Sequence, residues 1–108
     1  MSFKLPSAIG FLRSDISGLN QVQDELRIRS AAKRTGYDLR KTIVFTERTE
    51  NRLRRLCVAI DRLGVQAVIV PSAAHFDEGA IPAEVLAVAA VLTVAPGSTT
   101  PRTRPTTS

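Results

Sequence analysis

The sequence predicts an α/β fold: a small, open, mostly parallel sheet of four strands flanked by helices. Two observations predict it. Short, almost continuously apolar segments alternate along the chain with longer segments that repeat apolar residues at helical spacing, which is the pattern of strands joined by helical crossovers. The apolar segments also lack the alternation typical of a sheet with one wet face, so we expect helices on both faces.

The first strand is expected over residues 7–12, where the apolar run SAIGFL gives way to the polar loop RSDISG. A helix follows over 19–35, with Ser17 as its cap and Gly36 as its terminator. The apolar positions of this helix, at mostly helical spacing, are Leu19, Val22, Leu26, Ile28 and Ala32. This spacing predicts a helix with its apolar face on the sheet.

The rest of the chain repeats the alternation of strand and helix. The expected elements are a strand over 41–47, a helix over 46–64, a strand over 65–71, a short helix over 82–89 and a strand over 90–96. Leu53, Leu56 and Ile60 give the longer helix its apolar stripe, and Gly64 ends it. Pro82 suits the first turn of the short helix.

A length of 108 residues fits a single domain, which we place at residues 1–96. The remaining residues, 97–108, are rich in Gly, Ser, Thr and Pro, and we expect them to form a disordered tail.

The chain is basic, with 15 Lys and Arg against 10 Asp and Glu and a net charge of +5. Such an excess is compatible with contacts to nucleic-acid phosphates, although charge alone names no partner. The candidate contacts are Arg52, Arg54 and Arg55 in the longer helix and Arg102 and Arg104 in the tail. No recognition helix is evident, so any DNA binding is expected to be nonspecific.

Several classes of protein are excluded by what the sequence lacks. A single cysteine, Cys57, cannot form an internal disulfide or a multi-cysteine metal site. There is no G-x-G-x-x-G and no P-loop lysine, so we expect no cofactor. His75 is the only histidine and has no second histidine or cysteine ligand near it, so we expect no metal. No run reaches the ~18 apolar residues of a membrane span, and the first ten residues do not resemble a secretory signal. We therefore expect a cytoplasmic protein without membrane contact.

Two polar loops follow the first and third expected strands. Because the carboxyl ends of parallel strands meet at one edge of a sheet, these loops are where a ligand would bind. The candidate ligand-binding residues are Arg13, Ser14, Asp15 and Ser17 in the first loop and His75 and Asp77 in the second. The alternative is that they only cap a helix or pair with one another in a solvated loop.

The first part of the chain resembles the catalytic domain of serine recombinases, the resolvase/invertase family. That family ends its first strand in a pattern like GYARVST and continues into a helix that closes on GY. Here IGFLRSDISGLNQVQDELRIRSAAKRTGYDL is similar, with matches at Arg13, Gln23, Leu26, Ala32 and Gly36–Tyr37. The resemblance spans roughly residues 8–75. It implies a resolvase-like, that is flavodoxin-like, arrangement of the α/β domain.

The residues that perform the family's reaction are replaced. Asp15 stands at the position of the nucleophilic serine, and Ser14 is one position early. After the third strand the family has a pattern like LDRLGRS, and here Ala74, His75 and Glu78 take the places of its aspartate and two arginines. Phosphoryl transfer depends on cations at the reacting phosphate, so the resemblance implies the fold without the strand-exchange activity.

Three functions remain open from the sequence. The first is a catalytically inactive recombinase-like domain that acts in protein–protein interaction or regulation, either with another protein or as a homo-oligomer. The second is a domain or enzyme that uses the carboxyl-edge loops on a small anionic ligand. The third is nonspecific DNA binding through the arginines named above.

Overall fold

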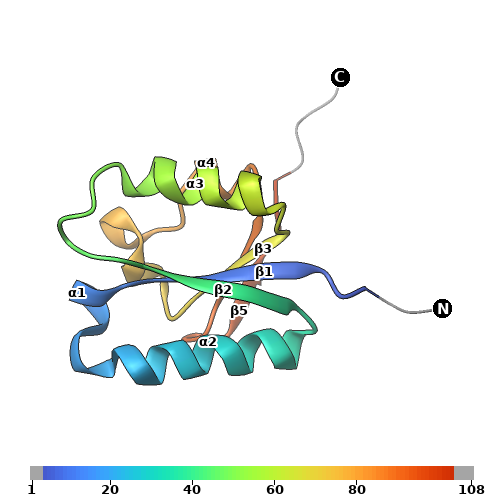
Figure 1. The fold of residues 1–108 in the computed structure, drawn as a ribbon, viewed down its shortest axis with the longest axis horizontal. Coiled ribbons are helices and arrows are strands. Elements are labelled where there is room, and N and C mark those ends of the chain that lie inside the picture. Colours follow the sequence, from blue (N-terminus) through green and yellow to red (C-terminus); the bar gives the residue numbers. More distant parts are fainter. Residues whose placement is uncertain (1–3, 104–108) are drawn as a thin grey trace.

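A computed structural model describes residues 4–103 and confirms the α/β class, with a mostly parallel open sheet flanked by helices (Figure 1). The elements in chain order are β1 (Ser7–Arg13), α1 (Ser14–Ser17), the 3₁₀ turn η1 (Gly18–Asn20), α2 (Gln21–Thr35), β2 (Asp38–Phe45), α3 (Arg52–Leu63), β3 (Ala67–Val70), the 3₁₀ turns η2 (Ala73–His75) and η3 (Asp77–Gly79), α4 (Ala83–Leu86), β4 (Ala90–Thr93) and β5 (Ser98–Thr100).

The described residues form one sheet of five strands in the order β2-β1-β3-β4-β5. The pairs β1–β2, β1–β3 and β3–β4 are parallel, and β5 runs antiparallel to β4. This is the doubly wound order of flavodoxin-like sheets. The chain moves outward from β1 to one side first and then to the other, so the winding reverses between β1 and β3. In such sheets that switch point is where ligands bind.

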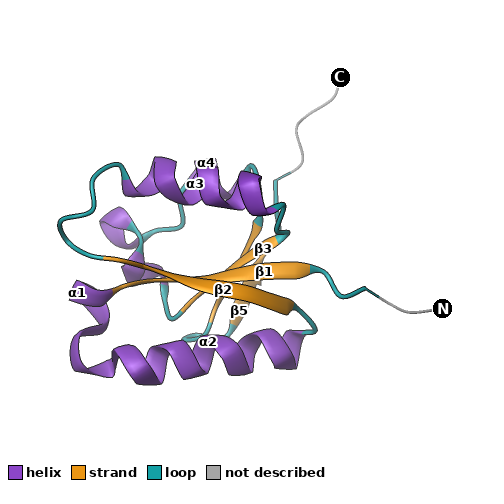
Figure 2. Ribbon diagram, in the orientation of Figure 1, coloured by secondary structure: helices purple, strands orange, loops and turns teal. Residues whose placement is uncertain are grey.

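Helices cover both faces of the sheet: α2 lies on one face, and α3 with the short α4 lies on the other (Figure 2). Successive side chains of β1 point to opposite faces. Ile9 and Phe11 belong to the core that includes Leu56 and Ile60 of α3. Ala8 and Leu12 belong to the core that includes Ile28, Ala31 and Ala32 of α2. All four residues of β3 are buried, which explains why its sequence is continuously apolar.

The fifth strand lies inside the segment that the sequence indicated was a disordered tail. β5 pairs with the edge of β4 through the registers Val91↔Thr100 and Thr93↔Ser98. The Thr93 hydroxyl helps close the connecting turn, because it donates to the Pro96 carbonyl oxygen at 2.6 Å. β5 therefore contradicts the prediction of disorder at Ser98–Thr100. Arg104 and the rest of the expected tail lie outside the described residues.

The helix α2 packs on the sheet with a different face from the one that the spacing of its apolar residues predicted. Ile28, Ala31 and Ala32 of α2 are buried. Leu19, Val22 and Leu26, which we expected on the same face, are exposed. Ser17 does not cap this helix either, because its hydroxyl donates to the Asp24 carboxylate at 2.7 Å. Gly36 does end the helix, in the left-handed conformation at φ 79°.

The connection between β2 and α3 is longer than expected, because α3 begins at Arg52 rather than at residue 46. The intervening residues form a turn in which the Thr46 N–H donates to the Thr49 hydroxyl at 3.0 Å. Asn51 adopts a left-handed conformation, φ 54°, just before the helix. The turn places the start of α3 at the carboxyl edge of the sheet. Across residues 4–103, every helix is too short or too polar to span a membrane.

Candidate functional site

The carboxyl edge of the sheet at the β1–β3 switch point gathers charged side chains from four elements. Arg13 is the last residue of β1, and Asp15 lies two residues further, in α1. Asp77 comes from the loop after β3, and Arg52 is the first residue of α3. These residues meet because parallel strands and their following loops share one edge. The structure therefore brings most of the sequence-predicted ligand residues together.

Arg13 is held between two carboxylates. Its Nη2 and Nε contact the two oxygens of Asp15 at 2.6 and 3.2 Å, and its Nη1 lies 3.0 Å from Oδ1 of Asp77. The Arg13 side chain is only 13% exposed, so this fork is fixed in place. The hydrogen bonds from Arg13 lower the pKa of Asp15, which keeps that carboxyl ionised as a counter-ion.

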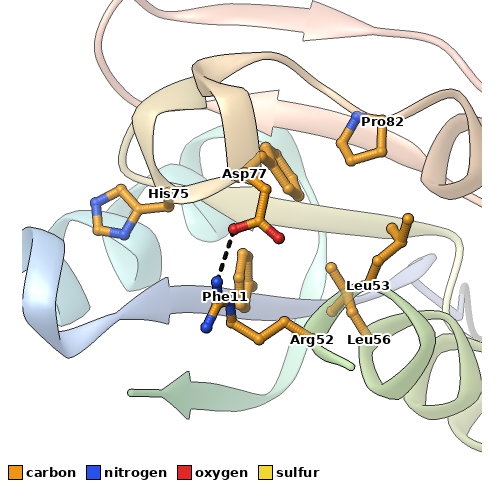
Figure 3. Close-up of a pocket in the computed structure, with 8 residues that line it drawn as sticks. Phe11, Arg52, Leu53, Leu56, His75, Asp77 and Pro82 are labelled. Carbon is orange, nitrogen blue, oxygen red and sulfur yellow. Dashed lines mark hydrogen bonds and ion pairs between the residues drawn. The ribbon is translucent and has the colours of Figure 1, made fainter. Parts of the chain in front are cut away.

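Arg52 approaches the same Asp77 oxygen from the other side. Its Nη2 lies 2.9 Å from Oδ1 of Asp77 (Figure 3). Its Nη1 donates to the Thr49 and Glu47 carbonyl oxygens at 3.0 and 3.3 Å, which anchors the guanidinium to the turn before α3. The Nε of Arg52 is shielded from solvent and has no hydrogen-bond partner among the described residues. One carboxylate oxygen therefore receives two arginines that come from different elements.

His75 joins the loop after β3 to the end of β1. Its side chain is buried, and Nδ1 accepts a hydrogen bond from the Arg13 backbone N–H at 2.9 Å. The proton of the neutral ring is therefore on Nε2. Burial lowers the pKa of His75, although the charge of Asp24 opposes the shift. The ring points away from the Asp77–Arg52 pair (Figure 3), although His75 is one of the residues that line the pocket beside that pair.

A small pocket opens beside the Asp77–Arg52 pair (Figure 3). Its volume is about 50 Å³, enough for a few water molecules or a small apolar group. The walls are mostly apolar and come from Phe11, Leu53, Leu56, Phe76 and Pro82. Phe11 and Phe76 pack against each other with ring centroids 5.5 Å apart. The site thus combines a charged rim with an apolar recess.

The remaining ligand candidates lie apart from the two arginines. Ser14 lines a shallow surface hollow with Asp15 and the turn residues Thr46, Glu47 and Arg48. Ser17 is buried and donates its hydroxyl to Asp24, so its oxygen is already engaged inside the fold. Among residues 4–103, no cluster of three or more His, Cys, Asp and Glu side chains is arranged to hold a metal ion.

Of the arginines that the sequence indicated for nucleic-acid contact, the four within residues 4–103 do not form one surface. Arg52 belongs to the charged cluster described above, with a side chain only 21% exposed. Arg54 and Arg55 lie on the exposed side of α3, where they line a shallow groove with Arg62. Arg102 packs beside Gly64 and Val65, at the opposite end of α3, and donates to the Ala87 carbonyl oxygen.

Sequence reasoning missed Arg52 as a member of the site. It was interpreted as one of several exposed helix arginines, because NRLRRL shows only a basic run at helical spacing. A usable signal was present in the topology: a helix that follows a parallel strand begins at the carboxyl edge of the sheet. The first residue of such a helix is a candidate for any site on that edge.

The fold and the site together define a small doubly wound α/β domain with an arginine–carboxylate cluster at its switch point. Comparison of the chain with protein-family models, with curated proteins and with solved structures finds no match. The resemblance to the resolvase/invertase family therefore rests on the quoted residues alone.

Proposed function

We propose that this chain is a recombinase-like domain without strand-exchange activity that works by binding, and that its carboxyl-edge site takes a small phosphorylated or otherwise anionic ligand. The observation that carries the proposal is the convergence of Arg13 and Arg52 on one oxygen of Asp77, at 3.0 and 2.9 Å. Two guanidinium groups aimed at one point are the usual way in which proteins hold a phosphate or carboxylate.

The two arginines are preorganised, whereas their shared counter-ion is not. Arg13 is fixed by Asp15, and Arg52 is fixed by two backbone carbonyls. Asp77 is 57% exposed and sits in a surface turn that continues through two left-handed residues, Glu78 and Gly79. Exposed ion pairs typically contribute only ~0–1 kcal/mol. An external anion can therefore replace the Asp77 carboxylate without disturbing the arginines.

The surroundings of the site favour binding over chemistry. Asp15, at the position of the family's nucleophile, is an ionised partner of Arg13 with a lowered pKa. His75 has its Nδ1 lone pair committed to the Arg13 backbone. General acid–base catalysis needs a group free to exchange a proton with the substrate. Neither residue is therefore arranged to act as a general base.

The apolar recess beside Arg52 limits the kind of anion that can bind at the site. Its apolar walls of Phe11, Phe76 and Leu56 suit a small apolar group, and Arg52 on its rim supplies a cation. The Nε of Arg52 offers a further donor that has no partner among residues 4–103. A phosphate monoester with a small aliphatic group fits both features, so methyl phosphate is a suitable probe.

Replacing Asp77 with asparagine is expected to tighten methyl phosphate binding by about tenfold, because the competing charge leaves the site while a similar shape remains. Arg52→Gln is expected to weaken binding by about tenfold or more. Arg54→Gln serves as the matched control, since it removes the same charge two residues away, on the exposed side of α3. Isothermal titration calorimetry at low ionic strength measures all three variants.

The proposal fails if Arg54→Gln and Arg52→Gln weaken binding equally, because the effect would then be one of net charge. It also fails if Asp77→Asn does not raise the affinity. Inorganic phosphate, titrated in parallel, reports the contribution of the arginines without that of the apolar recess, and we expect it to bind more weakly than methyl phosphate.

A further inference from the structure

Large apolar side chains stand in solvent on the outer side of α2 and of the turn before it. Leu19 is fully exposed, Val22 is 70% exposed and Leu26 is 51% exposed. We call these three residues the α2 stripe. None of them lines the pocket beside Arg52, so the α2 stripe is a different surface from the candidate ligand site.

The helical geometry of α2 places Val22 and Leu26 on the side of the helix that faces away from the core. At 3.6 residues per turn, Val22 and Leu26 lie about 40° apart around the axis and about half a turn from Ile28 and Ala31. Ile28 and Ala31 are buried against the sheet. The stripe therefore points directly outward and cannot be covered by the domain itself. Exposed apolar residues that align in this way commonly mark an interaction surface.

The charges along the same segment are sharply divided. Residues 14–26 contain three acidic residues and neither Lys nor Arg, whereas residues 27–35 contain four basic residues and neither Asp nor Glu. In the acidic half, Asp15 is paired with Arg13 and Asp24 is buried against Ser17, so Glu25 is the acid that has no salt bridge among the described residues. In the basic half, Arg29 and Lys33 are exposed. Two such segments packed side by side in opposite directions bring each acidic half against a basic half. Packed in the same direction, they bring like charges together.

We infer that the α2 stripe is a self-association surface, on which a second copy of this chain packs its own α2 in the antiparallel direction about a two-fold axis. Val22 of one copy then lies near Leu26 of the other, and the apolar stripes cover each other between the complementary charges. Antiparallel packing also sets the two helix dipoles in opposition, which is favourable. One helix face is smaller than the ~800 Å² per partner of a standard interface, so the dimer is weak and forms in the micromolar range.

Sedimentation velocity of the full chain over a series of micromolar concentrations tests this inference. The wild type is expected to show a concentration-dependent monomer–dimer equilibrium. Val22→Asp and Leu26→Asp are each expected to raise the dissociation constant by about tenfold or more, since each places a charge in the apolar contact of both copies. Both positions are exposed, so the variants should fold, and circular dichroism verifies it.

Val58→Asp is the matched control, because Val58 is a comparably exposed valine on α3 that lies outside the stripe. It is expected to leave the dissociation constant unchanged. Arg29→Glu is expected to weaken the dimer because it sets an acid against the partner's acidic half, and the effect should shrink at high salt. A wild type that stays monomeric overturns the inference, as does a Val58→Asp variant that dissociates as readily as Val22→Asp.

Discussion

Replacing Gly10 with valine is expected to lower the free energy of unfolding by about 3 kcal/mol. Gly10 lies in the middle of β1, which is paired on both sides, to β2 and to β3. A Cβ atom at this position would lie 2.7 Å from Cγ2 of Ile28 and 2.7 Å from Oγ1 of Thr42. The neighbouring strands fix the backbone, so the added atoms can be accommodated only by moving α2 or Thr42.

Two competing effects make this a sharp test. Valine is a favourable residue in strands, with propensity differences that span ~1 kcal/mol, so propensity alone predicts stabilisation. Steric crowding predicts the opposite sign and a larger size. Urea unfolding followed by circular dichroism measures the difference, with Gly10→Ala expected to fall between wild type and Gly10→Val. Gly97→Ala is the control, because the nearest atom to its Cβ, the Val94 oxygen, is at an ordinary 3.8 Å. Equal losses at the two glycines would contradict the close approach of α2.

The fold class could be predicted because burial on both faces leaves a direct mark on the sequence. All of Ala67–Val70 is apolar since both sides of β3 face helices. The side of α2 that packs on the sheet could not be predicted in the same way. Leu19, Val22 and Leu26 have helical spacing as regular as that of Ile28 and Ala32, and only the position of the sheet decides between them. The short edge strand β5 was missed because Ser98–Thr100 is polar and follows a Pro-Gly turn, which is typical of loops.

The position of the site could be predicted from the order of strands and helices along the chain. Arg13, His75 and Asp77 follow the two strands that flank the switch point, so the sequence order was enough to place them on one edge. The individual partners were not predictable. Asp77 bridges Arg13, 64 positions away, and Arg52, 25 positions away, and no local pattern records such a pairing. The pairing of His75 with the Arg13 backbone depends in turn on how the β3 loop turns back over β1.

Replacing His75 with alanine is expected to lower the free energy of unfolding by about 2–3 kcal/mol at neutral pH. The substitution leaves the Arg13 backbone N–H without its acceptor, and an unsatisfied group in a protein interior costs about 1–3 kcal/mol. It also empties the volume of a ring that is 3% exposed, which adds a cavity contribution. His75→Asn is the matched variant, because its side-chain oxygen can accept the same hydrogen bond, and it is expected to retain more of the stability than His75→Ala.

The same histidine makes stability depend on pH. Burial lowers the pKa of folded His75 below its ordinary value of 6.5, so the unfolded chain binds a proton more readily than the folded one. Stability is therefore complete above pH 6.5 and falls as the pH drops below it, with a slope of at most about 1.4 kcal/mol per pH unit. Asp15, whose pKa is lowered from 3.8, keeps its contribution down to that pH and loses it only in stronger acid. His75 therefore affects stability below pH 6.5, whereas Asp15 affects it only below pH 3.8.

Urea unfolding of the wild type and of His75→Asn between pH 7 and pH 5 isolates the contribution of the histidine. The wild type is expected to lose stability across this interval, while His75→Asn stays nearly constant because it has no proton to gain. Protonation of His75 would fill the Nδ1 lone pair and expel the Arg13 N–H, which separates the loop that carries Asp77 from the end of β1. Parallel decline of the two proteins would show that another group titrates and that His75 does not contribute to the pH dependence.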